Sequence, residues 1–216
     1  MTTPMTDLSR YRQEVLSELT DDILAFWMRN VIDFDSGGFH GLVDGKGVAV
    51  PTADKGVILA TRILWTFSRA YTRIKNEAYL RTAELMYRYL LDHFLDKERG
   101  GVFWIVDSKG RPLDSTKKFY GQAFAIYAFC EFSSASGNRQ ALEEARQLFS
   151  LVERYGRDPV EGGYLDALGA DWTPIQDTRL SEKDLNTPKT MNTNLHVLEA
   201  YSKLVQQDPR GPVTEA

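Results

Sequence analysis

Four polar side chains lie on three segments that are otherwise apolar and have the periodicity of helices. Each segment follows a lysine, and the four side chains come three or seven residues after it: Arg62 after Lys55, Tyr120 after Lys117, and Asn192 and His196 after Lys189. Positions three and seven share one face of a helix. If the three helices surround a cavity, a guanidinium, a phenol, an amide and an imidazole would meet in it, and this mixture suits a polyol substrate.

Each of these side chains also has a structural interpretation. Arg62 could form an ion pair between helices, and His196 could be a hydrogen-bonded structural histidine. The phenol and the first amide could bond loop carbonyls, and the aromatic residues on the same face, Trp65 and Tyr127, are typical of core packing. Burying four unpaired polar groups would cost several kcal/mol in total. A polar cavity is therefore the hypothesis that accounts for all four together.

Other chemistries have less support in the sequence. The three histidines, His40, His93 and His196, are far apart and lack metal-ligand spacing, so neither a metal nor a cofactor is predicted. The Gly-Gly pairs lack the context of nucleotide-binding loops, and no GxSxG elbow occurs. A glycosidase needs two opposed carboxylates, and nothing in the sequence places Asp184 and Glu199 as such a pair.

A repeat of about 62 residues organises the chain. Gly-Gly pairs begin 63 and 62 residues apart, and a turn residue follows seven positions after each first glycine; the glycines are Gly37, Gly100 and Gly162, and the turn residues are Asp44, Asp107 and Gly169. Alternating apolar residues around such a turn predict a short β-hairpin. Each hairpin leads to one of the apolar helices, which we expect to open on the lysines. For the third helix, Thr187 is the expected N-cap and Pro188 the first helical residue.

Amphipathic segments between these units predict outer helices, of which the first places Leu16, Leu19 and Ile23 at helical spacing. Buried inner helices alternating with outer helices are typical of an α/α toroid. We therefore predict an all-α fold of the (α/α)6-barrel type in which residues 1–216 form one domain, about half a ring. The expected parts are three repeats of outer helix, hairpin and inner helix and the start of an interrupted fourth, with approximate bounds 10–75, 76–137, 138–207 and 208–216.

Composition limits the class of protein. The 216 residues are 43% hydrophobic and 26% charged, as in globular domains. The net charge of −4 and the pI near 5.5 argue against nucleic acid or an anionic membrane as partner. The sequence contains no run approaching the ~20 apolar residues of a membrane span and no secretory-signal pattern. A single cysteine, Cys130, excludes an internal disulfide and fits a reducing compartment, so we expect a cytoplasmic protein.

Several stretches resemble the N-acylglucosamine 2-epimerase superfamily, most closely its cellobiose 2-epimerase branch. The resemblance covers nearly the whole chain and is carried by ILAFWMRNVIDFDSGGFHG, DKGVILATRILWTFSRAY, RGGVFWIVDSKGRP, FYGQAFAIYAF and RLSEKDLNTPKTMNTNLHVLEAY. It implies an (α/α)6 barrel of which this chain is the N-terminal half. It also implies cofactor-independent inversion at C2 of an open-chain aldose. A histidine removes the C2 proton, an enediol(ate) forms, and a second histidine returns the proton to the opposite face.

The resemblance also implies roles for individual residues. Arg62 and His196 are expected to polarise the open-chain carbonyl and to assist ring opening. Tyr120 and Asn192 are expected to contact the substrate, a mono- or disaccharide, and Asp184 to bind sugar hydroxyls.

The two acid–base histidines of the family belong to the other half of the barrel, and neither His40 nor His93 is placed to replace them. A smaller departure is Asn194, where relatives often have another histidine. We therefore expect little or no turnover from this chain alone, and we expect a separate C-terminal half to restore it. The alternatives are a non-catalytic carbohydrate-binding module and a self-associating half-toroid.

Overall fold

The computed structural model describes residues 4–215. The helices are α1 (Pro4–Ser17), α2 (Ala25–Asn30), α3 (Val57–Ile74), α4 (Glu77–Tyr89), α5 (Phe119–Ser136), α6 (Arg139–Leu151) and α7 (Met191–Gln207), with π-helical segments η1 (Glu18–Leu24), η2 (Leu90–Phe94) and η3 (Val152–Gly156) and the 3-10 turn η4 (Pro212–Glu215). The strands are β1 (Ile32–Asp33), β2 (Gly38–Phe39), β3 (Lys55–Gly56), β4 (Ile105–Val106), β5 (Pro112–Asp114), β6 (Lys117–Lys118) and β7 (Ala167–Leu168). Within the described residues, none of the helices combines the length and apolar character of a membrane span.

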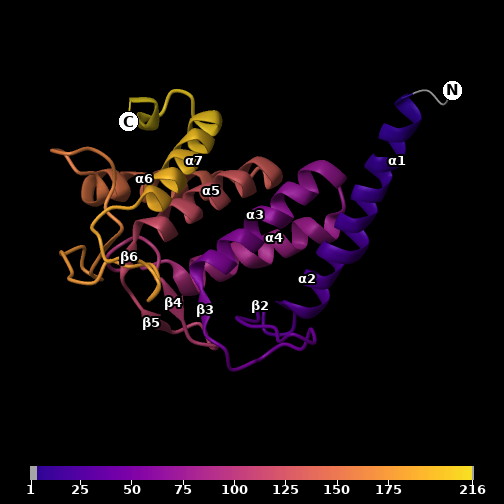
Figure 1. Ribbon diagram of the computed structural model, residues 1–216, viewed down its shortest axis with the longest axis horizontal. Coiled ribbons are helices and arrows are strands. Elements are labelled where there is room, and N and C mark those ends of the chain that lie inside the picture. The colour runs from indigo at the N-terminus through magenta and orange to yellow at the C-terminus, as the bar shows by residue number, and fades with distance from the viewer. Residues whose placement is uncertain (1–3, 216) are drawn as a thin grey trace.

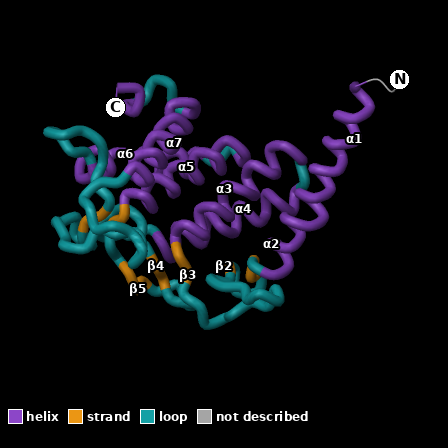
Figure 2. The backbone as a smooth tube through the Cα atoms, in the orientation of Figure 1, coloured by secondary structure: helices purple, strands orange, loops and turns teal. Residues whose placement is uncertain are grey.

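The helices form two layers. The inner helices α3, α5 and α7 lie side by side with α5 in the middle, while α4 packs mainly on α3 and α6 mainly on α5 (Figure 1). The strands and most of the loops gather at one end of the helices (Figure 2). Outer helix, hairpin and inner helix thus follow one another three times, and the predicted half-ring of an α/α toroid is confirmed.

Residue choice explains the two layers. The middle inner helix α5 is apolar on nearly every side and is covered on most of its surface, as expected for a helix between two neighbours and an outer layer. The outer helices α4 and α6 are amphipathic and begin at Asn76 and Asn138, whose side chains accept hydrogen bonds from Ala78 N (3.0 Å) and Ala141 N (3.1 Å).

Short strands connect neighbouring repeats. Strand β3 pairs antiparallel with β4 of the next repeat, with Lys55 opposite Val106, and β6 pairs in the same way with β7, with Lys117 opposite Leu168. Two further bonds bind the first turns of the inner helices to the same hairpins, Val57 N to Trp104 O (3.0 Å) and Phe119 N to Asp166 O (2.9 Å). The predicted turns are present at all three positions. Among the described residues a returning strand follows only the second, and the first is closed by an isolated bridge between Val43 and Ala49.

This pairing corrects two predictions. Lys55 and Lys117 lie in strands, and α3, α5 and α7 begin two residues after the three lysines instead of on them. The N-cap of α7 is Thr190, whose hydroxyl accepts from Thr193 N (3.3 Å), and not Thr187. The carbonyl of Pro188 instead accepts a hydrogen bond from Asp166 N (2.8 Å), so that residue belongs to the connection between hairpin and helix.

The three lysines, here called the anchoring lysines, fasten the start of each inner helix: Lys117 and Lys189 bind carboxylates just before the Gly-Gly pairs of their own repeats, and Lys55 binds the outer helix α4 of the next repeat. Lys117 is fully buried and its Nζ lies 2.6 Å from Asp96, four residues before the Gly-Gly pair. Lys189 binds Asp158 at the same position of the third repeat (2.7 Å). In the first repeat the buried Lys55 donates to the Tyr89 hydroxyl (3.0 Å).

Side-chain amides hold the same hairpins. Gln122 accepts from Val102 N (2.8 Å) and donates to Val102 O (3.0 Å). Asn194, five residues after its anchoring lysine as Gln122 is, makes the same pair of bonds with Tyr164 (2.9 and 3.1 Å). A Cβ on the second glycine of the pair would come within 3.0 Å of the first amide and 2.7 Å of the second, which explains that glycine. Asn194 is thus a hairpin ligand in this chain.

Candidate sugar site on the inner face

Phe124 is the centre of a cluster on the inner face of the three inner helices. The Arg62 guanidinium lies 4.9 Å from the Phe124 ring centroid. The Tyr120 ring is 4.9 Å and the His196 ring 4.6 Å from the same centroid. The structure therefore brings together three of the five site residues predicted from the sequence, one from each inner helix.

His196 is oriented by a carboxylate one turn further along α7. Its Nδ1 lies 2.6 Å from Glu199 Oε2, and its ring stands edge-on to Tyr120 at 4.9 Å and 82°. An ionised carboxylate only accepts hydrogen bonds, so a neutral imidazole that donates to Glu199 through Nδ1 has Nε2 as its acceptor. Half-buried among aromatic rings, the imidazole is positioned to exchange a proton or a hydrogen bond through Nε2.

An aromatic wall continues the face below this cluster. Trp65 and Tyr127 stack at 5.6 Å and 18°, and with Arg62, Phe124 and two threonines they line a cavity of about 270 Å³. The Trp65 indole N–H is buried and has no hydrogen-bond partner within the described residues. Burial, together with the nearby Glu199 and Glu131 carboxylates, raises the pKa of Tyr127, which keeps this phenol neutral.

The far end of the inner face is ionic. Buried Glu131 lies 3.4 Å from Arg69 and 2.5 Å from Lys203, so the three inner helices are joined at their C-terminal parts. These residues come fourteen positions after the three anchoring lysines. They border a second cavity of about 510 Å³, which shares Trp65 and Tyr127 with the first.

Two predicted site residues lie apart from the cluster. Asn192, in the first turn of α7, is exposed, and the structure gives its amide no hydrogen bond within residues 4–215. Asp184 lies in the loop before α7, where its carboxylate accepts from Ser181 N (2.8 Å) and Oγ (3.0 Å). Among the described residues it has no hydrogen bond or ion pair with Arg62 or His196.

Lys118 links that loop to the cluster. Its Nζ donates to the carbonyls of Arg179 (2.8 Å) and Leu180 (3.3 Å) and lies 4.6 Å from the Trp104 ring centroid. The Trp104 ring in turn stands edge-on to Tyr120 at 6.5 Å. Burial lowers the pKa of Lys118, and the loop that carries Asp184 is held beside the site by this side chain.

Sequence reasoning missed the contacts made by Phe124, Glu199 and Glu131. Phe124 and Glu199 come seven and ten residues after an anchoring lysine, on the face of the candidate site, but the sequence pattern gives Phe124 no role and Glu199 no partner. Extending the same count to offset fourteen would have found Glu131 with Arg69 and Lys203.

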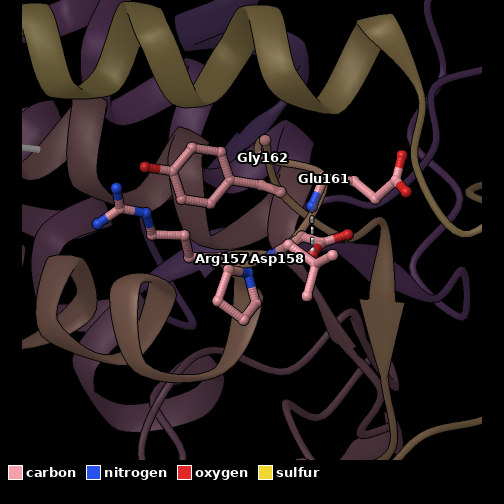
Figure 3. Close-up of a pocket in the computed structure, with 8 residues that line it drawn as sticks. Arg157, Asp158, Glu161 and Gly162 are labelled. Carbon is pink, nitrogen blue, oxygen red and sulfur yellow. Dashed lines mark hydrogen bonds between the residues drawn. The ribbon is translucent and has the colours of Figure 1, made fainter.

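A separate hollow of about 580 Å³ lies at the third hairpin and is lined by residues 157–164 alone (Figure 3). Its carboxylate is already engaged, because Asp158 accepts from Val160 N (2.9 Å) and Glu161 N (3.1 Å) and binds Lys189. The hydrogen bond from Lys189, followed by those amides, lowers the pKa of Asp158 to about 2. We assign this hollow to the anchoring of the hairpin. In the described part of the chain, no three His, Cys, Asp or Glu side chains are grouped to hold a metal ion.

Comparison with known proteins agrees with this geometry. Residues 37–208 match the family N-acylglucosamine 2-epimerase (GlcNAc 2-epimerase). The chain belongs to this family. It is 47% identical over 193 residues to cellobiose 2-epimerase of Bacteroides fragilis and 39% identical over 202 residues to that of Ruminococcus albus, with 89% and 94% of this chain covered.

Solved structures of family members have the same fold. The structure of cellobiose 2-epimerase from Spirochaeta thermophila superposes with a TM-score of 0.89 at 42% identity, covering all of this chain and 53% of that one. A D-mannose isomerase structure, at 24% identity and a TM-score of 0.76, shares the fold. The chain spans about half the length of the curated relatives that it matches, 49% and 51% for the two named above.

Proposed function

We propose that the inner face binds the aldose end of a mono- or disaccharide and forms one wall of a sugar 2-epimerase site. The convergence of Arg62, Tyr120 and the Glu199-oriented His196 on Phe124 is the observation that carries this proposal. The relatives named cellobiose 2-epimerase make cellobiose the first substrate to test. Epimerisation breaks the C2–H bond, moves that electron pair into a C1–C2 double bond, and places negative charge on O1.

Each residue has a role in this proposal. The Arg62 guanidinium faces the charge on O1, where a fixed cation stabilises the enediolate more than the aldose. His196 exchanges the ring-oxygen proton through Nε2 during ring opening. Tyr120 and Asn192 donate hydrogen bonds to sugar hydroxyls. Asp184, from its loop, accepts hydrogen bonds from sugar hydroxyls. Trp65 and Tyr127 offer flat apolar surface.

The C2 proton itself needs a further base. His93 lies behind the inner helices, with its ring 4.3 Å from Tyr89 and Nδ1 3.3 Å from Gly110 O, and His40 lies beside the first hairpin. Neither belongs to the inner face. We therefore propose that the chain alone binds saccharide and turns it over weakly or not at all, in a cytoplasmic setting. The division into repeats 10–75, 76–137 and 138–207 is part of the same proposal.

Binding and exchange can be measured in one experiment. Cellobiose and mannose are titrated into the protein in D2O, with NMR following binding and deuterium at C2. We expect saturable binding and little or no C2 exchange. Arg62→Met should weaken binding tenfold or more, whereas Arg73→Met, exposed near the end of the same helix and lining neither inner-face cavity, should leave it unchanged.

Each alternative outcome has a definite meaning. Folded protein that binds neither sugar, or an Arg62→Met variant that binds as tightly as the parent, overturns the site. Rapid deuterium incorporation at C2 overturns the inference that this chain lacks the base for the C2 proton. Binding that is strong, selective and without any exchange favours a carbohydrate-binding module over a partial enzyme.

A further inference from the structure

Residues 176–187, here called the Asp184 loop, are closed by hydrogen bonds at the base of the loop. The Asn186 side chain accepts from Thr178 N (3.1 Å). The Thr178 hydroxyl donates to Thr187 O (2.7 Å). These bonds tie the two ends of the loop together, but they do not determine where its tip lies relative to the inner helices.

Lys118 makes the contact that fixes the tip. From the end of strand β6, its Nζ donates to the carbonyls of Arg179 (2.8 Å) and Leu180 (3.3 Å). Within the described part of the chain, no other hydrogen bond or ion pair joins residues 177–186 to a residue outside the Asp184 loop. Because both acceptors are backbone atoms, the contact fixes the path of the chain and does not depend on the side chains that the loop carries.

A lysine occurs at this position in the second repeat only. The residue after the anchoring lysine is Gly56 in the first repeat, Lys118 in the second and Thr190 in the third. Lys118 is half-buried, and its ammonium lies 4.6 Å from the Trp104 ring centroid. Burying an ammonium costs free energy unless the charge is bound. The common fold of the repeat does not require this cation, so its presence is explained by what it binds.

The charges around Lys118 support the same role. Burial lowers the pKa of Lys118, and the carboxylates of Asp114, Asp177 and Asp184 oppose this shift. Asp177 is already paired with Arg179 (2.7 Å), whereas Asp184 has no ion pair among the described residues. Without the ammonium, the carboxylates of the loop and of strand β5 would repel one another. The carboxylate that remains able to accept further hydrogen bonds is that of Asp184.

We propose that Lys118 is a positioning residue of the sugar site, which holds the Asp184 loop so that the Asp184 carboxylate can accept hydroxyls of the bound saccharide. This inference rests on the proposed function and adds the side chain on which the position of Asp184 depends. Lys118 itself does not touch the sugar, because its ammonium is engaged by the carbonyls of Arg179 and Leu180 and by the Trp104 ring.

Trypsin tests the contact without sugar. Cleavage after Arg179 requires its carbonyl to enter the oxyanion hole of the protease, and in the folded chain that carbonyl accepts from Lys118. Lys118→Met should therefore speed this cleavage about tenfold or more. Lys118→Arg retains a cationic donor and should be cut at the parent rate. Lys109→Met, exposed at the turn of the second hairpin, is the matched control and should also be cut at the parent rate. Mass spectrometry of a time course measures the cleavage.

The affinity for cellobiose, measured by isothermal titration, separates an effect through the loop from a direct contact. Lys118→Met and Asp184→Asn should each weaken binding. The double variant should bind no more weakly than Asp184→Asn alone, because the carboxylate that one change removes is displaced by the other. If Lys118 touched the sugar directly, the two losses would multiply. Lys118→Arg and Lys109→Met should bind like the parent.

The outcomes distinguish this inference from the proposed function. Cleavage after Arg179 that is no faster in Lys118→Met than in the parent overturns the inference, whether or not sugar binds. Undiminished affinity in Lys118→Met, or losses that multiply in the double variant with Asp184→Asn, also overturn it. A folded parent that binds no saccharide overturns the proposed function, and with it the role of Asp184. Faster cleavage would then still show that Lys118 holds the loop.

Discussion

Two rows of side chains, one just before the three inner helices and one on them, differ in how much the residue type changes from repeat to repeat. The anchoring row is Lys55, Lys117 and Lys189, the same residue type each time, and each lysine binds a hairpin or outer-helix group. Seven positions later the row is Arg62, Phe124 and His196, three different types that meet at one point. The same structural contact is needed in every repeat, so the same residue type recurs. A binding site needs a different chemical group from each inner helix, so the residue types differ.

Breaking the most buried anchor should have the largest effect. Asp96→Asn leaves the Lys117 ammonium buried without its carboxylate, and removing one partner of a buried ion pair costs about 3–5 kcal/mol. The free energy of unfolding, measured with urea, should fall by this amount.

The matched change in the third repeat is Asp158→Asn, where Lys189 is partly exposed and also donates to Gly162 O (3.0 Å). Its stability loss should be clearly smaller. Equal losses in the two variants would mean that burial does not set the strength of the anchors.

A substitution on the inner face should weaken sugar binding while leaving the stability of the fold nearly unchanged. Phe124→Leu removes the ring shared by Arg62, Tyr120 and His196 but retains an apolar side chain on a half-buried position. We expect the affinity for cellobiose to fall about tenfold, or about 1.4 kcal/mol, with little change in unfolding free energy. Isothermal titration and urea unfolding measure the two quantities.

Phe132→Leu, on the same helix, is the control. Phe132 is buried and stacks on Tyr87 of the outer layer at 4.7 Å, so its truncation should lower stability by about 1 kcal/mol or more and leave affinity unchanged. If both variants lose stability alike and binding alike, Phe124 is core packing and not the centre of a site.

Acid should produce the smallest effect. The pKa of Asp158 lies at about 2 in the folded chain against an ordinary 3.8, because Lys189 and two backbone amides bind its ionised form. A depressed pKa contributes stability above about pH 4 that is lost as the pH falls towards 2. The protection of the Val160 and Glu161 amides, measured as the exchange rate relative to the intrinsic rate at each pH, should fall over this range in the wild type and should be low throughout in Asp158→Asn. Wild-type protection that stays the same between pH 4 and 2 would contradict the assignment.

The sequence predicted the ring because the repeat is visible in local patterns, namely the paired glycines, the turn residues that follow them and the apolar segment after each lysine. It placed the starts of the inner helices two residues early because Lys55 and Lys117 pair with hairpins about fifty residues away, and Lys189 is held by its hairpin before α7 begins. Thr187 and Pro188 had the local features of a cap, but the bond from Asp166 N to Pro188 O placed them outside the helix.

The site was predicted in part for a similar reason. Offsets along a helix show which residues share a face, and this was enough to bring Arg62, Tyr120 and His196 together. These offsets do not show which side chains on the face touch one another. The contact of His196 with Glu199 and the central position of Phe124 are therefore seen only in the structure. Asp184 lies in an irregular loop, where no periodicity indicates direction.

The pairing of β3 with β4 and of β6 with β7 has a consequence for the order in which the chain matures during synthesis. Val57 N and Phe119 N receive their acceptors only from the hairpin one repeat later. On the ribosome, α3 and α5 therefore wait with their first turns open until the next hairpin has emerged, although domains otherwise tend to fold from the N-terminal end as they appear. The first turn of each of these two helices is therefore completed only after the next repeat has been synthesised.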